Sequence, residues 1–220
     1  MKAQTRSHQG WALPTVMAVM GLGALAALSL ARGVWLHANL LRSDGDEWRA
    51  RWAAEALLRE AEQDLLASFA AAKDARHSTP ASDTVPASPF IPHTLAGLAQ
   101  LRKALPAGLC RDGICAPDAL EPTSATVWVQ RLNTAARYGQ YTGGAALSSS
   151  QINPALTERS GYWLEAFANA DTSQTTPLWR ITALAQASPR SGPIMLQAWW
   201  QGASDTPTVG RWLSWHEVLP

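Results

Sequence analysis

The sequence predicts an α+β fold, in which a long N-terminal membrane-spanning α-helix packs on a C-terminal antiparallel β-sheet. Three observations predict it. Residues 11–31 form an uncharged apolar run, and residues 46–73 continue with strong helix formers that repeat in a helical pattern. The C-terminal half then holds short β-prone runs separated by Gly and Pro. A long helix laid on such a sheet gives a two-layer architecture.

Composition and charge narrow the class of protein. The 220-residue chain has a net charge of +1 and no long basic block. Phosphate binding needs clustered Lys and Arg, so nucleic acid is not expected as a partner. Eleven tryptophans supply too much rigid apolar surface for a disordered chain. We therefore expect one globular domain with accessory segments.

The N-terminus predicts a membrane anchor. Residues 1–10 are polar and positively charged, whereas the apolar run at 11–31 would span about 31 Å as a helix, close to the ~30 Å hydrocarbon core of a bilayer. The positive residues favour a cytoplasmic N-terminus, with the remainder of the chain on the outer side. A cleaved secretory signal peptide is the alternative, with Ser29-Leu30-Ala31 as its cleavage site.

Residues 32–73 are expected to extend this helix beyond the membrane. Apolar residues recur there at spacings of three and four, which predicts one apolar face: Ala54, Leu58, Ala61, Leu65 and Phe69. Asp44 as a cap and Glu47 three residues later indicate a fresh helix start, so a kink or a short unwound stretch is expected at residues 43–46. On the outer face, Glu55 and Arg59 have the spacing of an ion pair.

Residues 74–94 are predicted to be a linker, and residues 95–220 the secreted head domain. The linker contains four prolines among Ser, Thr and Asp, which prevents a regular element. Five runs in the head are predicted as strands: 126–129, 162–167, 178–185, 194–200 and 209–218. Within 178–185, the alternation places Trp179 and Ile181 on one face and Arg180 on the other.

Cys110 and Cys115 are separated by four residues, with the strong turn signal Asp112-Gly113 in the middle. Such a turn brings the two Cα atoms close enough to bridge. A redox-active pair instead needs Cys-x-x-Cys spacing in a βαβ setting, and neither is present. A structural disulfide worth about 2 kcal/mol is therefore predicted.

No residue set in the sequence points to catalysis. The five histidines are scattered, and neither a nucleophile elbow nor a phosphate loop is found. We therefore expect a protein that is not an enzyme and has no catalytic, cofactor-binding or metal-binding residues. The Trp-rich tail could stack on sugars, although dense Trp is more often core or protein interface.

The motif Gln9-Gly10, directly before the apolar run, resembles the cleavage site of type IV prepilins. That resemblance implies a leader at residues 1–10, cutting after Gly10 by a prepilin peptidase, and methylation of the new N-terminus at Trp11. Thr15 then holds mature position five, where major pilins carry Glu. A carboxylate in the bilayer is costly unless paired, and in pilins this Glu is thought to pair with the N-terminal amine of a neighbouring subunit. By analogy with that family, a subunit without the Glu is expected at the fibre tip and not in the shaft.

Two further stretches resemble minor pilins of the PilX type. One is Ala53-Ala54-Glu55-Ala56-Leu57-Leu58-Arg59-Glu60-Ala61-Glu62, and the other is the strand series around 162–165, 178–185 and 194–200. The resemblance implies a pilin-like fold and a role in type IV pilus assembly at the tip or in the priming complex. It also implies an inner-membrane subunit with a periplasmic head that later joins the surface fibre. Its partners would be other minor pilins, fibre subunits and a large tip adhesin.

Two alternatives stay open at this point. One is the tip pseudopilin of a type II secretion system, which genome context would separate from a pilus subunit. The other is a membrane-tethered envelope enzyme or carbohydrate-binding protein, which a cleft with converging carboxylates or an aromatic platform would favour.

Overall fold

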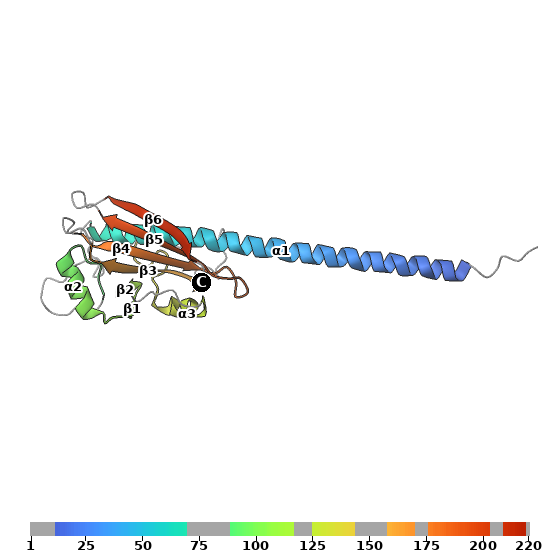
Figure 1. Ribbon diagram of the computed structural model, residues 1–220, viewed down its shortest axis with the longest axis horizontal. Helices are drawn as coiled ribbons and strands as arrows, with labels where there is room; N and C mark the ends of the chain where they lie inside the picture. Colours follow the sequence, from blue (N-terminus) through green and yellow to red (C-terminus); the bar gives the residue numbers. More distant parts are fainter. Residues whose placement is uncertain are drawn as a thin grey trace, which may run out of the picture. The chain divides into compact units, whose positions relative to one another are not determined.

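The computed structural model describes residues 12–69, 89–116, 125–143, 158–169, 176–202 and 209–218. The chain divides into two compact units, Met1–Gly45 and Asp46–Pro220. The described part of the first unit is helical throughout, and the second unit contains the sheet and the remaining helices. The predicted α+β layout is confirmed, because a long N-terminal helix packs on a mostly antiparallel sheet (Figure 1).

Helix α1 runs from Ala12 to Phe69. The helix is continuous through residues 43–46, so the fresh start predicted at Asp44 was wrong. Asp and Gly each cost a helix interior up to about 1 kcal/mol, which the strong helix formers on both sides outweigh. Asp46 forms an ion pair with Arg49 one turn later instead of beginning a new helix.

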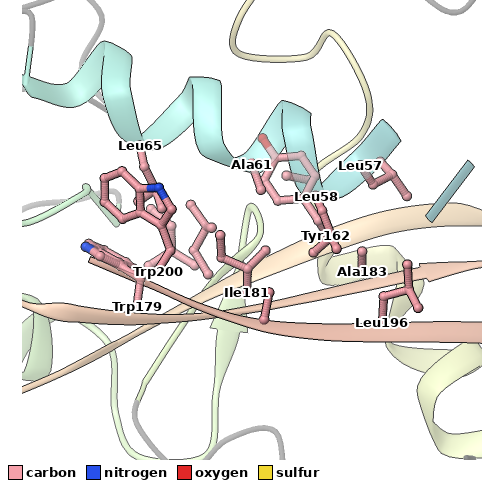
Figure 2. Close-up of a cluster of buried hydrophobic side chains, with 14 of the residues drawn as sticks. Leu57, Leu58, Ala61, Leu65, Tyr162, Trp179, Ile181, Ala183, Leu196 and Trp200 are labelled. Atoms are coloured by element: carbon pink, nitrogen blue, oxygen red, sulfur yellow. The ribbon is translucent and has the colours of Figure 1, made fainter. Parts of the chain in front are cut away.

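The head half of α1 buries the apolar face that the sequence predicted. Its buried apolar residues are Ala50, Ala53, Ala54, Leu57, Leu58, Ala61 and Leu65. Figure 2 shows Leu57, Ala61 and Leu65 above the sheet. The alanines let the helix backbone approach the strands closely, while each buried Leu contributes about 1.5–3 kcal/mol. The side chain of Phe69 and residues 70–73 lie outside the described residues.

The sheet has six strands in the order β1-β2-β3-β4-β5-β6. The last four form an antiparallel meander: β3 Ser160–Phe167, β4 Leu178–Ala185, β5 Ile194–Gly202 and β6 Gly210–Val218. These confirm the predicted strands at 162–167, 178–185, 194–200 and 209–218. The short hairpin of β1 Cys110–Arg111 and β2 Ile114–Cys115 is added through a parallel pairing of β2 with β3.

Side chains of β3, β4 and β5 alternate between two largely buried faces. The helix face packs under α1 and includes Tyr162, Trp179, Ile181, Leu196 and Trp200 (Figure 2). The outer face holds a smaller cluster with Trp163, Leu184 and Met195. The predicted alternation of Trp179 and Ile181 against Arg180 is therefore confirmed. Both faces of β3, β4 and β5 are largely buried, whereas the side chains of β6 are mostly exposed.

The run at 126–129 was predicted as a strand and is a helix. Helix α3 spans Ala125–Gln130 and continues into the 3-10 helix η1, Arg131–Thr134. The Trp128 ring packs edge-on against the Trp163 ring, with centroids 5.7 Å apart. A run of four β-prone residues has little local preference, so this aromatic contact on the outer face decides its structure.

Helix α2, Leu95–Ala104, begins the part predicted as the head. Thr94 caps it, because its hydroxyl oxygen accepts a hydrogen bond from the backbone N–H of Gly97. Of the predicted linker, residues 74–88 lie outside the described residues. Phe90 and Ile91 are fully buried in the core, so the last residues of that segment belong to the head.

Candidate functional site

The first candidate site is the apolar segment of α1 in the N-terminal unit. Its large apolar side chains are between 52% and 73% exposed: Leu13, Val16, Met17, Val19, Met20, Leu22, Leu25, Leu28, Leu30, Val34, Trp35, Leu36, Leu40 and Leu41. A surface helix in water carries polar residues on its open side. Between Leu13 and Leu30, Thr15 and Ser29 are the only polar side chains of this helix, and α1 is long and apolar enough to cross a membrane.

The predicted processing residues, Gly10 and Trp11, lie outside the described residues. Thr15 is described, and it is an exposed residue near the beginning of α1. The residue expected at mature position five therefore lies on the apolar segment.

The predicted disulfide between Cys110 and Cys115 is confirmed, with an S–S distance of 2.04 Å. It links directly opposed residues of β1 and β2. Asp112 and Gly113 have φ values of 52° and 74°, both in the left-handed region that the tight two-residue turn requires. The predicted Asp-Gly turn is therefore present.

Gly113 also fixes the hairpin against the sheet. Its N–H donates a hydrogen bond to the Thr134 carbonyl, and its carbonyl accepts one from the Leu164 N–H. A Cβ added at Gly113 would come within 2.5 Å of the Ala136 Cβ and 2.7 Å of the Ala136 backbone N. Only glycine fits this close approach, so the turn is both a hairpin and a docking point for β3.

Two buried carboxylates hold α1 to the head. Glu60 Oε1 accepts a hydrogen bond of 2.8 Å from the backbone N–H of Gly139 and another from the Thr142 hydroxyl. One turn later, Asp64 accepts a hydrogen bond from the Tyr162 hydroxyl. A buried carboxylate is tolerated only when such donors satisfy it. Glu60 and Asp64 therefore act as fasteners between α1, the loop that follows η1, and strand β3.

Arg137 makes a second clamp on the loop after η1. Its guanidinium donates hydrogen bonds to the backbone carbonyls of Leu132, Glu158 and Ser160. Burial lowers the pKa of Arg137 from its ordinary value, and the nearby Glu158 carboxylate partly opposes that shift. Arginine still remains charged at neutral pH. The clamp thus holds the start of β3 against η1.

An ion pair on the outer face of the sheet was not foreseen. Glu165 and Arg180 are directly opposed on β3 and β4, and Arg180 Nε lies 2.8 Å from Glu165 Oε2. The guanidinium also lies over the rings of Phe167 and Trp199, at 5.1 Å and 5.9 Å from their centroids. Because Glu165 is fully buried, this pair is part of the fold and not of a solvent-facing surface.

The second candidate site is a groove between α1 and the edge strand β6. It has a volume of about 280 Å³ and is lined by Glu55, Leu58, Arg59, Trp212 and Trp215. Trp212 is 36% exposed and Trp215 is 57% exposed. In the part of the chain that the structure describes, no ion pair joins Glu55 to Arg59, contrary to the expectation from their spacing.

The sequence contains one local signal for this groove, an apolar run in strand β6. The run Trp212-Leu213-Ser214-Trp215 is unusually apolar for a strand that ends a sheet. Glu55 and Arg59 are more than 150 residues away from this run in the chain. Only the tertiary structure brings them beside it. Among the described residues, no group of three or more His, Cys, Asp or Glu could hold a metal ion.

Comparison with known proteins adds no relative. No protein-family model, no curated protein and no solved structure matches the chain.

Proposed function

We propose that this chain is a minor pilin of the PilX type, a membrane-anchored structural subunit that acts in the assembly of a type IV pilus. The observation that carries the proposal is helix α1. Its N-terminal part is apolar on every side, and its head part is buried on one face against an antiparallel sheet. The Gln9-Gly10 motif before the apolar run and the strand series of the head support the same assignment.

The function follows from what the apolar segment needs. In a bilayer, lipid tails surround it; outside the bilayer, its large side chains must be covered by other apolar surface. Exposing each of them to water would cost about 1.5–3 kcal/mol, so release as a soluble monomer is strongly unfavourable. Packing among the helices of sister subunits replaces the lipid contacts. The same segment thereby serves first as an anchor and then as an assembly element.

The disulfide supports a head on the outer side of the membrane. Disulfides persist in oxidising compartments such as the periplasm and are rare in the cytosol. Together with the positive residues before the apolar run, the Cys110–Cys115 bridge favours an inner-membrane protein with a cytoplasmic N-terminus and a periplasmic head. The head then presents its surface to other minor pilins and to a large tip adhesin.

Thr15 refines the place of the subunit. If the leader is removed after Gly10, an uncharged residue occupies mature position five, where a shaft subunit carries a carboxylate. A subunit without that charge suits the first position in the fibre, where no neighbouring amine is waiting to pair with it. We therefore place the chain in the tip or priming complex.

The test is the mass of the N-terminal peptide of the chain isolated from its native host membrane. The proposal expects a peptide that begins with N-methylated Trp11. A chain that begins near Arg32 would identify a signal peptide and overturn the assignment. An N-terminus that still includes residues 1–10, in cells with an active prepilin peptidase, would also contradict it.

A tip pseudopilin of a type II secretion system has the same architecture and the same processing. Deletion of the chain separates the two, since a pilus subunit should reduce surface fibres and a pseudopilin should reduce secreted enzymes. The groove with Trp212 and Trp215 favours, as a different candidate, a membrane-tethered carbohydrate-binding protein, because indole rings stack on sugar faces.

A further inference from the structure

Strand β6 leaves one side of the sheet open. It is the last strand in the sheet order and pairs with β5 along one side (Figure 1). Among the described strands, none pairs with its other side. Edge strands usually carry charges or proline that prevent further pairing. The centre of β6, Trp212-Leu213-Ser214-Trp215, has neither charge nor proline, but a β-bulge lies there, because Trp199 pairs with Ser214 and Trp200 pairs with Trp212. On either side of the bulge, the open edge of β6 offers backbone N–H and C=O groups to another extended chain.

A helix stripe adjoins this edge. Trp48, Trp52, Glu55 and Arg59 follow one another at helical spacings of four, three and four, and therefore lie along one side of α1. Glu55 and Arg59 line the groove with Trp212 and Trp215. An ion pair of 2.6 Å between Arg51 and Glu217 fixes the next turn of the helix beside the end of β6. We call this stripe, together with Trp212, Leu213 and Trp215, the β6–α1 surface.

The size of the β6–α1 surface fits a protein interface. Trp48 and Trp52 are 62% and 69% exposed, in addition to the partly exposed Trp212 and Trp215. A tryptophan presents up to about 250 Å², so these four leave on the order of 500 Å² of apolar area open. With a polar rim in the usual proportion, the surface reaches about 800 Å², which is what one partner buries in a standard interface. The apolar part alone is comparable with the largest apolar patch of a typical monomer, about 300–600 Å², which is often functional.

We propose that the β6–α1 surface docks an extended strand of a different polypeptide, which pairs with the free edge of β6. In this mode, main-chain hydrogen bonds give affinity, and alternate side chains of the added strand enter pockets beside the edge. The groove accepts an apolar side chain between Trp212 and Trp215. Glu55 and Arg59 at its margin can bind polar groups on the same side of the incoming strand.

A second copy of this chain does not fit as the occupant. Two β6 strands paired about a two-fold axis would run antiparallel, and the two α1 helices would then point in opposite directions. Both could not be anchored in one membrane from the same side. A copy in the parallel orientation would have to offer its other sheet edge, β1, which has only two residues. This exclusion rests on the membrane-anchor part of the proposed function, whereas the docking surface itself does not.

The experiment uses the full-length chain in its native host, with the photocrosslinker p-benzoylphenylalanine placed at Leu213 or at Trp215. Leu109 is the matched control, because it is 54% exposed and lies outside the β6–α1 surface. After irradiation, the crosslinked peptides are sequenced by mass spectrometry. The proposal expects adducts of positions 213 and 215 with one other polypeptide, on residues of a single short segment. Position 109 should give no adduct with that polypeptide.

A second variant tests the helix stripe. Trp52→Glu places a charge on the exposed stripe and should reduce the adduct at least fivefold, while Leu109→Glu should leave its yield unchanged. An unchanged thermal melting temperature shows that Trp52→Glu still folds. Three outcomes overturn the proposal: an adduct only with a second copy, an adduct only with lipid or saccharide, or no adduct above the Leu109 control.

The result can be separated from the fate of the proposed function. A Gly10→Val chain should not be processed if it is a prepilin, yet its β6 edge is unchanged. An adduct at position 213 in a chain that proves not to be a pilin would keep the docking surface and remove the pilus role. Methylated Trp11 without any adduct at positions 213 or 215 would support the pilus role and remove the docking surface.

Discussion

The hydroxyl of Tyr162 donates a hydrogen bond to Oδ2 of Asp64 over 2.8 Å, and neither side chain is exposed to solvent. The bond joins strand β3 to helix α1 between residues 98 positions apart in the sequence. A buried carboxylate that loses a donor keeps its full desolvation cost. This contact therefore tests how strongly the helix is held on the sheet.

Tyr162→Phe is expected to lower the free energy of unfolding of the head by about 1–3 kcal/mol, because Asp64 stays buried with one donor fewer. Urea unfolding of the full chain in detergent, followed by tryptophan fluorescence, measures it. Tyr138→Phe is the matched control, since Tyr138 is half-buried at the core and its hydroxyl forms no hydrogen bond with the described residues. Equal losses in both variants would show that the Asp64 contact contributes nothing specific.

Gly113→Ala is expected to cost more than Gly108→Ala. Both glycines have left-handed backbones, with φ of 74° and 82°, so each substitution carries about 1–2 kcal/mol of strain. Only at Gly113 does the new methyl group also meet backbone, because the Ala136 N would lie 2.7 Å away. We expect a loss above about 3 kcal/mol at Gly113, measured by thermal unfolding. A loss at Gly113 no larger than at Gly108 would contradict the described docking of the hairpin.

Removing the disulfide is expected to destabilise the head by about 2 kcal/mol, since the bridge closes a short loop and restrains the unfolded chain only modestly. The Cys110→Ser, Cys115→Ser double variant should therefore melt about 4–8 °C lower than the unmodified chain. Added reductant should lower the melting temperature of the unmodified chain and leave that of the double variant unchanged. A reductant effect on the double variant would mean that the shift has another origin.

Arg180→Met is expected to destabilise the head by about 3–5 kcal/mol, because it leaves the fully buried carboxylate of Glu165 without its cation. Adding Glu165→Gln removes the buried charge and should restore part of the loss. Denaturant unfolding of Arg180→Met, of Glu165→Gln and of the double variant, each compared with the unmodified chain, gives the coupling between the residues. If the loss of stability in the double variant equals the sum of the losses in the two single variants, the two side chains are not coupled.

Gly10→Val is expected to abolish cutting of the leader, since the proposed peptidase site ends at this glycine. The mass of the chain should then include residues 1–10, and surface fibres counted by electron microscopy should fall strongly. Ala3→Val in the same leader serves as the control, because it introduces the same side chain away from the proposed cut and should mature normally. Normal maturation of the Gly10→Val chain would remove the basis of the pilin assignment.

The meander was predictable because its signals are local. Strands β3, β4 and β5 carry β-prone residues with turn residues between them, and the sheet pairs them in sequence order. The apolar face of α1 was predictable for the same reason, since Leu58 and Leu65 recur at helical spacing. Asp112-Gly113 is likewise a local signal, and its left-handed turn is present.

Other features depend on contacts that no short window contains. The helix at 125–130 follows from the packing of Trp128 on Trp163, and its own residues favour a strand. Glu60 and Asp64 read as ordinary polar residues of a helix, and only the fold shows them buried against β3 and the loop after η1. The groove could not be predicted, because it forms only where α1 packs beside β6. The prediction that the helix is interrupted at Asp44 was wrong, because the capping signals there are weaker than the helix propensity of the residues on both sides.

The sequence separation between α1 and the sheet that packs on it also determines which of them is synthesised first. The ribosome makes Asp64, and the apolar face of α1 around it, before it makes Tyr162, which follows 98 residues later. At about 5–20 residues per second, that face waits on the order of 5–20 s before the sheet that shields it exists. Until the sheet is made, the apolar face of α1 is therefore open to contact with other chains.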